Sequence, residues 1–403
     1  MSSKNKTNLL TGILLQIFWP FAGFLFSFNK VFKEQTTIIY ILLAGYYGFV
    51  YAPTPESDMV RYLQEFERIS RLSFQNLYEE ILSGEFSDYY TVTLSYFVSY
   101  FTYNPKIYLA IASMIFAYFY LKSISLILNS FTLDNSIFSN ILIFVLYFYV
   151  SIFFINGLRF YTAFFVFFYA LIQIYFFKNR KFYFLLIITP LIHLSYTGIV
   201  AIFLLFSLFS KWRAIAFFIL FVSIFSSLTT FNFSFLTGDN KSQEKIISYT
   251  NVESISGFYE ELGEMRAQTN QKYKVFEAIS EYHYHFVLIF FILILISREK
   301  LLSTFDNYDP KLINLNIYLL SLVFFTQNIP EGYRFKHIFV FFFFISLTTV
   351  FYKLVKIGLF RNLILFVSLV VLPYILSIIY INLATVPMDF YFSNWIVVYF
   401  LEQ

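Results

Sequence analysis

The chain has 403 residues, of which 59% are hydrophobic and only 13% are charged, and its mean hydropathy is +0.68. Because soluble domains carry about 25% charged residues, this composition excludes a soluble enzyme and predicts that a bilayer surrounds most of the chain. The net charge of +4 indicates no particular partner, and the absence of cysteine excludes disulfides and thiolate chemistry. We predict a single integral membrane domain over residues 1–403 with an all-α fold.

Apolar runs of roughly 20 residues, the length that spans a bilayer, follow one another along the chain. The first run continues into a second and lacks a small-residue cleavage site, so we interpret it as a retained helix and not a signal peptide. The runs predict a polytopic membrane helical bundle with about 11–12 transmembrane helices. They cover residues 8–28, 36–52, 106–128, 137–155, 159–177, 182–209, 214–236, 284–297, 311–329, 335–352 and 362–384.

The segment between the second and third runs carries more acidic than basic residues. Residues 57–71 predict an amphipathic helix, because apolar side chains recur there at helical spacing with charged residues between them. We expect this helix to lie in the plane of the membrane interface. The apolar positions are Met59, Tyr62, Leu63, Phe66 and Ile69. Residues 89–103 form a short aromatic run that predicts a re-entrant or interfacial segment.

The run at 182–209 is too long for one plain helix. Pro190, His193 and Ser195 lie in its middle, so we predict a broken helix or a tight hairpin with His193 near the turn. Membranes tolerate such a break where protein or a cavity satisfies the freed backbone groups.

Basic clusters orient the later helices, since lysine and arginine are enriched in cytoplasmic loops. Four clusters mark the cytoplasmic side: 178–181, 211–213, 298–300 and 353–361. Residues 156–159, the neighbourhood of His193, 237–283 and 328–334 then face outward. Segment 52–105 also faces outward if 89–103 does not span. In the rival topology 89–103 spans and the N-terminus is inside; Lys4 and Lys6 favour it, whereas Lys30 and Lys33 oppose it.

Four short motifs carry polar chemistry, and this topology places all of them on the outer face. Asp58, Arg61 and Tyr62 share one helical segment; Asn156 and Arg159 precede a span; His193 and Ser195 lie in the broken run; Tyr333, Arg334 and His337 open a late span. Each motif alone also fits a structural role, as a solvated helix, a snorkelling arginine, a packed histidine or a charged cap. If all four motifs surround one outward cavity, their arginine and histidine side chains would suit the negative charge of a diphosphate.

No metal or nucleotide site is expected. The four histidines are scattered, and neither a zinc-binding helix motif nor a glycine-rich phosphate loop is present. We therefore expect no cofactor, no metal and no nucleic-acid partner.

The four motifs resemble those of the EpsG family, which is related to Wzy-type O-antigen and capsule polymerases. The Asp-x-x-x-Tyr motif is matched by Asp58 and Tyr62 and the Asn-Gly-x-Arg motif by residues 156–159. Ile-His-x-Ser is matched by 192–195 and a late arginine by Arg334. The order and spacing agree over about residues 50–345. The chain departs from the family pattern at Glu56-Ser57, Phe160 and Leu194.

The resemblance implies a GT-C-like fold in the bacterial inner membrane and a glycosyltransferase-type polymerase. Such an enzyme joins polyprenyl-diphosphate-linked oligosaccharide units on the periplasmic or extracellular face. The expected partners are this lipid-linked sugar, membrane lipids, a chain-length regulator and a flippase. His193 is favoured as the base and Asp58 as a group that orients the acceptor. The expected substrate-binding residues are Arg61, Tyr62, Asn156, Arg159, Ser195, Tyr333, Arg334 and His337.

Three alternatives remain open at the level of sequence. A flippase for the lipid-linked oligosaccharide predicts about twelve evenly spaced spans in two related halves, which the long segments 52–105 and 237–283 oppose. A non-catalytic scaffold predicts no clustering of arginine and histidine. An O-antigen ligase uses the same donor with a different acceptor.

The lack of cysteine makes the topology directly testable. Single cysteines introduced at Ser57, Thr269 and Asn328 are expected to react with a membrane-impermeant maleimide in intact cells. Labelling of Thr269→Cys or Asn328→Cys only after lysis would overturn the topology. The same result for Ser57→Cys would support the arrangement in which 89–103 spans.

Overall fold

The computed structural model of the chain is helical, with no strand among the residues that it describes. Those residues are 3–27, 34–51, 53, 58–84, 86, 89–130, 145, 148–150, 154, 157–175, 177–228, 271–302, 310–327, 332–351, 365, 369–380 and 386–401. Two compact units divide the chain, and neither is continuous in sequence. Unit 1 comprises 1–130, 151–196 and 382–403; unit 2 comprises 131–150 and 197–381.

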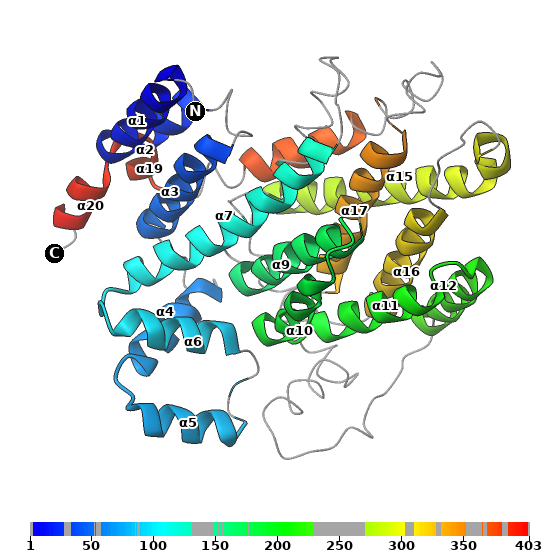
Figure 1. Cartoon of the computed structure of the whole chain (residues 1–403), viewed down its shortest axis with the longest axis horizontal. Coiled ribbons are helices and arrows are strands. Elements are labelled where there is room, and N and C mark those ends of the chain that lie inside the picture. Colours follow the sequence, from blue (N-terminus) through cyan, green and yellow to red (C-terminus); the bar gives the residue numbers. More distant parts are fainter. Residues whose placement is uncertain are drawn as a thin grey trace. The chain divides into compact units, whose positions relative to one another are not determined.

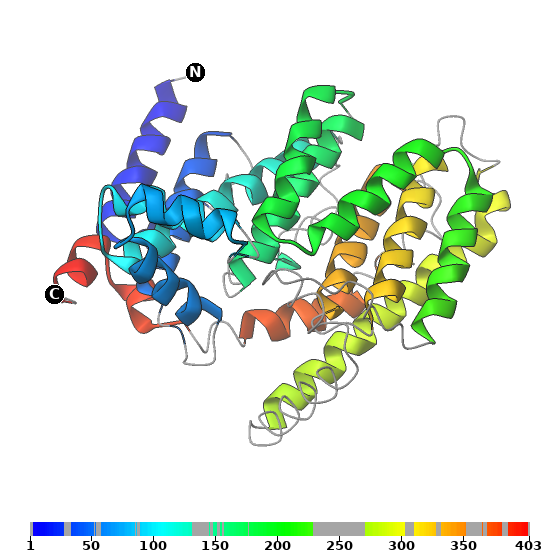
Figure 2. The same ribbon diagram turned by 90° about the horizontal axis from the view of Figure 1, so that it is seen from below.

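Unit 1 is built around the pair α3 and α7, which lie side by side (Figure 1, Figure 2). The pair packs closely because glycines on α3 face α7. A Cβ atom on Gly48 would lie 2.6 Å from the carbonyl oxygen of Leu109 and 2.3 Å from Oγ of Ser113. On the other side of α7 lie α9 and then α10. The helices of unit 1 up to this point are α1 (Ser3–Phe18), α2 (Pro20–Ser27), α3 (Glu34–Val50), α4 (Asp58–Ile69), α5 (Phe74–Leu82), α6 (Tyr89–Ser99), α7 (Pro105–Ser130), α9 (Leu158–Tyr175), η3 (Arg180–Phe182) and α10 (Tyr183–Ile192).

Helices α4, α5 and α6 form a small cap in which α4 and α6 contact α7 and α5 lies outermost (Figure 1). The predicted apolar face of α4 is present, since Met59, Tyr62, Phe66 and Ile69 are buried. It packs on protein, because the ring of Phe66 stacks on that of Tyr108 with centroids 4.9 Å apart. The predicted amphipathic helix is thus present with its apolar face packed on protein, and its position in the plane of the membrane interface stays a prediction.

Local signals explain where α5 begins and ends. The hydroxyl of Ser73 accepts a hydrogen bond from the backbone N–H of Asn76 at 3.2 Å, as an N-cap does. Gly84 follows the helix with φ of 75°, a left-handed conformation that glycine adopts without strain. Leu77 on α5 packs into a cluster with Ile69 and Val92, which holds α5 to the cap.

The C-terminal helices α19 (Met388–Phe392) and α20 (Trp395–Leu401) are fastened to the first helices of unit 1. The hydroxyl of Tyr46 donates to the carbonyl of Asp389 at 2.7 Å, and the indole N–H of Trp19 donates to the carbonyl of Tyr391. The ring of Phe390 stacks on that of Tyr46. Residues more than 340 positions apart are thus joined by hydrogen bonds to backbone carbonyls.

Unit 2 contains a bundle in which α16 packs on both α12 and α17, and α17 also contacts α15. The amide of Asn314 donates to the carbonyl of Ser210 at 2.8 Å and so satisfies a backbone acceptor that follows α11. The helices are α11 (Tyr196–Phe209), α12 (Arg213–Ser227), α15 (Gln271–Leu302), α16 (Pro310–Thr326), α17 (Tyr333–Phe351) and a helix over Leu369–Tyr380. The first residue of α11, Tyr196, belongs to unit 1.

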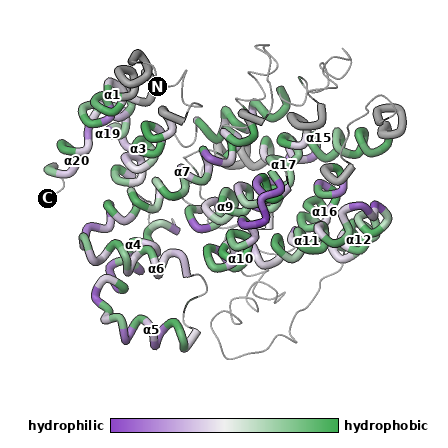
Figure 3. Tube along the Cα trace, viewed as in Figure 1, coloured by the Kyte–Doolittle hydropathy of each residue, from purple (hydrophilic) through white to green (hydrophobic). Residues whose placement is uncertain are grey.

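Three of the described helices are long and apolar enough to cross a bilayer: Pro105–Ile127, Leu158–Tyr175 and Ala278–Ile296. Five shorter apolar helices accompany them in the described ranges. Helices α10 and α11 are hydrophobic almost throughout, whereas α4 and α5 carry hydrophilic stretches (Figure 3). The chain is therefore a helical membrane protein. Most of the predicted span 137–155 and of the outer segment 237–283 lies outside the described residues.

Two sequence expectations about breaks and short helices agree with the fold. The run at 182–209 is interrupted between α10 and α11, and His193 has an extended backbone there (φ −151°, ψ 119°). Helix α6 has 11 residues and is about 16 Å long, too short to cross a hydrocarbon core of about 30 Å. Its length favours the topology in which 89–103 does not span.

Close packing of α3 on α7 gives a stability prediction. Gly48→Ala is expected to destabilise the protein by about 1–3 kcal/mol, because the new methyl group meets a backbone carbonyl that cannot move aside cheaply. Gly198→Ala is the matched control: its Cβ would lie 3.8 Å from the nearest atom, on Leu322, so its stability should be unchanged or higher. Thermal unfolding in detergent measures both. Equal midpoints for the two variants would contradict the packing argument.

Candidate functional site

The first polar group of the site lies on α4. Asp58 occupies its first turn, where a carboxylate is favoured by the helix dipole, and forms an ion pair with Arg61. Arg61 is two-thirds exposed. Tyr62 is buried instead, which raises the pKa of its phenol while nearby Arg159 opposes that shift. The hydroxyl of Tyr62 therefore keeps its proton at neutral pH.

Arg159 joins this group from α9, 97 residues further along the chain. Its Nε donates a hydrogen bond to the hydroxyl of Tyr62 at 3.0 Å, and its guanidinium carbon lies 4.8 Å from the centre of the Tyr62 ring. Gly157 precedes α9 because a Cβ there would lie 2.9 Å from the ring of Tyr161. The half-buried Arg159 is thus held by hydrogen bonding and ring contact with a neutral phenol.

His193 contacts the first turn of α9 through Phe160, the residue next to Arg159. Its ring meets that of Phe160, the residue after Arg159, edge to face with centroids 5.5 Å apart. Phe160 also contacts Tyr196 at the start of α11. The break after α10 therefore brings His193 against the residue next to Arg159, as the packing of α9 on α10 requires.

Ser195 contacts the same nitrogen of His193 twice. Its Oγ lies 2.8 Å from Nδ1, and its backbone N–H donates to Nδ1 at 3.4 Å. A backbone N–H can only donate, so this second contact favours a ring whose proton is on Nε2. In that tautomer Nε2 is a donor for an anion. A base function at Nε2 requires the other tautomer, in which Nδ1–H donates to the hydroxyl of Ser195.

Three of the four predicted motifs therefore meet within unit 1, through α4, α9 and α10. The fourth, with Arg334 and His337, belongs to unit 2. That all four surround one outward cavity stays a prediction. Asn156 and the side chain of Tyr333 lie outside the described residues.

The sequence model of the EpsG family matches residues 15–395, nearly the whole chain. The chain belongs to the EpsG family. This membership makes it a membrane protein of polysaccharide biosynthesis, of the Wzy polymerase-like kind. No curated protein and no solved structure matches the chain.

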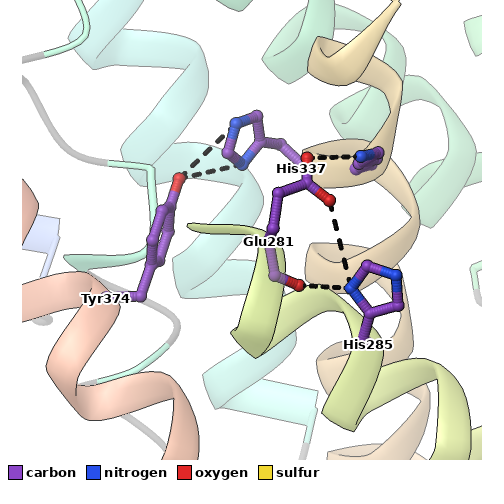
Figure 4. Close-up of polar contacts among 5 residues, drawn as sticks. Glu281, His285, His337 and Tyr374 are labelled. Carbon is purple, nitrogen blue, oxygen red and sulfur yellow. Dashed lines mark hydrogen bonds and ion pairs between the residues drawn. The ribbon is translucent and has the colours of Figure 1, made fainter. Parts of the chain in front are cut away.

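In unit 2 of this EpsG-family protein, His337 is part of a buried polar network. Its Nδ1 lies 3.0 Å from the hydroxyl of Tyr374, which faces the ring in Figure 4, and 3.3 Å from that of Tyr149. The Tyr149 hydroxyl also lies 3.0 Å from Nε2 of His283. All four side chains are buried, and the ring of His283 stacks on that of Tyr374 at 3.9 Å. His337, expected to bind substrate, is thus held inside unit 2 by tyrosine hydroxyls.

The network lies beside a charged pair at the start of α17. Lys336 donates to the carboxylate of Glu281 on α15 at 2.7 Å. Glu281 also faces His285 one turn along the same helix (Figure 4). Arg334 is half-buried and is the second residue of α17. These contacts fix the first turn of α17, and with it the position from which Arg334 projects.

Sequence reasoning missed three members of this network: Tyr149, His283 and Tyr374. The four histidines are scattered in sequence, yet the fold brings His283 and His337 to one tyrosine hydroxyl. A weak signal was available, because His283 is an ionisable residue inside the span Ala278–Ile296, where such residues usually have a polar partner. Nothing local distinguishes Tyr149 and Tyr374 among 34 tyrosines.

The Tyr149 hydroxyl is expected to stabilise unit 2. Tyr149→Phe removes a hydrogen-bond partner of two buried imidazoles and should lower the free energy of unfolding by about 1–3 kcal/mol. Tyr318→Phe is the matched control, because within the described part of the chain the buried hydroxyl of Tyr318 has no partner. Thermal unfolding in detergent compares the two. A loss with Tyr318→Phe as large as with Tyr149→Phe would argue against the network.

Proposed function

We propose that this EpsG-family protein is a polysaccharide polymerase that joins polyprenyl-diphosphate-linked oligosaccharide units on the outer face of the bacterial inner membrane. The observation that carries the proposal is the contact between Tyr62 and Arg159. It brings the Asp58 motif to the Asn-Gly-x-Arg motif, so a carboxylate, a phenol and a guanidinium come from two distant segments of one unit. The family match supports the same class of activity.

The two half-buried arginines, Arg159 and Arg334, share a feature that suits an anionic donor. Arg159 and Arg334 are each the second residue of a helix, α9 and α17. The N-terminus of a helix carries partial positive charge, so a cation there is unfavourable unless an anion lies nearby. A helix start therefore favours a diphosphate, and the planar guanidinium of arginine matches its oxygens in pairs.

The transfer needs one base and a stabilised leaving group. The acceptor hydroxyl oxygen forms a bond to the anomeric carbon of the donor, whose bond to the diphosphate oxygen breaks. Polyprenyl diphosphate leaves with the electron pair, and the base takes the proton of the hydroxyl. Because the donor stores the energy, the residues need only orient the reactants and balance charge.

The sequence favoured His193 as the base and Asp58 as the group that orients the acceptor. The contact from the Ser195 N–H to His193 favours the reverse assignment. With its proton on Nε2, His193 donates to a diphosphate oxygen beside Arg159. Asp58 then accepts the acceptor proton, with Arg61 beside it and Tyr62 one helical turn away. In unit 2, His337 positions Arg334 through the first turn of α17 and does not itself bind substrate.

The product pattern of a deletion strain tests the proposed activity. A strain without this polymerase should cap its acceptor with a single repeat unit. A flippase deletion adds none, and a ligase deletion leaves polymer on the lipid carrier. Either of these two patterns would sink the proposal.

Arg159→Lys and Arg334→Lys should each lose most polymerisation while still inserting in the membrane. Lysine keeps the charge but lacks the planar fork, and bidentate contacts are what the diphosphate requires. The matched control is Arg68→Lys, a half-exposed arginine on α4 that is paired with Glu80 and lies outside the proposed site. It should polymerise normally. Wild-type chain length in both site variants would contradict binding of diphosphate by the fork.

The roles of Asp58 and His193 separate in a purified assay with lipid-linked repeat units. Asp58→Asn should lower turnover by about 10²–10⁴-fold with donor binding kept, as loss of a base does. His193→Ala should raise the KM for the donor, and His193→Asn, which keeps a donor N–H, should recover part of it. If His193→Ala loses turnover at unchanged donor KM and Asp58→Asn stays active, His193 is the base.

A further inference from the structure

We infer that α5 and α6 hold the outer cap in the lipid headgroup region through an exposed aromatic stripe. The stripe consists of three exposed residues on α5, Phe74, Tyr78 and Leu82, of half-buried Tyr96 on α6, and of exposed Tyr100, which directly follows α6. The sequence predicted an interfacial helix at 57–71 and a re-entrant or interfacial segment at 89–103, which contains Tyr96 and Tyr100; the exposed side of α5 was not expected. The occupant inferred here is the lipid interface itself.

Helix α5 has three distinct sides. Leu77 is buried and Ile81 half-buried in the cap. Phe74, Tyr78 and Leu82 follow at intervals of four residues, so they lie together on one side, yet they are 68%, 53% and 67% exposed. The remaining side is polar and includes Gln75, Asn76 and Glu79. A helix whose second apolar side is left bare at the edge of a membrane protein is suited to the interface.

The stripe is continuous between the two helices. The ring of Phe74 lies 6.4 Å from that of Tyr78 and 6.2 Å from that of Tyr96. Tyr96 in turn meets Tyr100 at 5.1 Å, and their hydroxyls share a hydrogen bond of 2.8 Å. Residues 89–103 contain no charged side chain. Aromatic rings with a polar tip prefer the boundary between hydrocarbon and water, which is where this stripe would lie.

The chemistry of the stripe favours lipid over the other possible occupants. A sugar-binding platform places hydrogen-bond donors and acceptors among its rings. On α5 the polar side chains that lie opposite the stripe are Asn76 and Glu80, each two residues from Tyr78, and Glu80 is paired with Arg68. The stripe ends in a leucine and carries no charge, and two of its three tyrosine hydroxyls are hydrogen-bonded to each other.

The anchor has a consequence for the site, and this step alone rests on the proposed function. The same cap carries Asp58 and Tyr62 on α4, which packs against α6. Fixing the cap at headgroup depth would hold Tyr62 and Arg159 at the level where the diphosphate of a lipid-linked sugar lies. Substrate and site would then meet without lifting the lipid from the bilayer.

Spin labels test the anchor in the intact protein, because the chain has no cysteine of its own. Tyr78→Cys places a nitroxide on the stripe, and Asn76→Cys places one on the polar side of the same helix as a matched control. Both proteins are studied in phosphatidylcholine nanodiscs by power saturation with oxygen, which enriches in lipid, and with a water-soluble nickel chelate. The label at 78 should favour oxygen and the label at 76 should favour nickel, so the accessibility ratio reverses across one helix.

Two results would overturn the inference. Nickel accessibility at both positions would place the stripe in water, as a glycan platform requires. Protection of the label at 78 from both reagents would indicate a protein partner or a second copy of the chain. Leu82→Cys repeats the measurement one turn further along and guards against a local disturbance at 78. Polymer length plays no part in this test, so a failed anchor and a failed polymerase assignment give different results.

Discussion

A guanidinium at the start of a helix inside a membrane protein needs a partner, and the arrangement of unit 1 follows from how Arg159 finds one. Helix α9 is buried along most of its length, so water is scarce around its first turn. The partner is a phenol from α4, which must therefore dock on α7 and α6 to bring Tyr62 within reach. His193 reaches the same turn from the opposite side, through the ring of Phe160. The site is thus assembled around one charge.

The kind of partner matters as much as its presence. The hydroxyl of Tyr62 accepts a hydrogen bond from Nε of Arg159 and so orients the guanidinium without adding a negative charge of its own. Unit 2 follows the same rule, since the hydroxyls of Tyr149 and Tyr374 hold the imidazole of His337. An abundance of tyrosine therefore has a use beyond packing: each ring fills apolar space and each hydroxyl satisfies a buried polar group.

What the sequence could and could not predict follows from how local each signal is. The spacing of Met59, Tyr62 and Phe66 predicted the buried face of α4, because helical periodicity is written in neighbouring residues. It could not tell that α6 and α7, and not lipid, cover that face. Pro190 and His193 likewise predicted the break before α11. The pairing of Tyr149 with His283 spans 134 residues and has no local pattern. The exposed side of α5 was not predicted, because exposure, not periodicity, distinguishes Phe74 from Leu77.

The fastening of the last helices to the first has a consequence for the order in which the protein matures. Chains fold from the N-terminus as they are synthesised, yet the hydroxyl of Tyr46 and the indole of Trp19 bond to carbonyls near the C-terminus. Unit 1 therefore cannot complete its fold until residues 382–403 have been synthesised. Unit 2 ends at residue 381, so all of its residues are synthesised earlier. An incompletely translated chain would lack the carbonyls to which Tyr46 on α3 and Trp19, between α1 and α2, donate. Membrane quality control would meet that state first, and a fusion partner joined at the C-terminus would sit directly on the closing element.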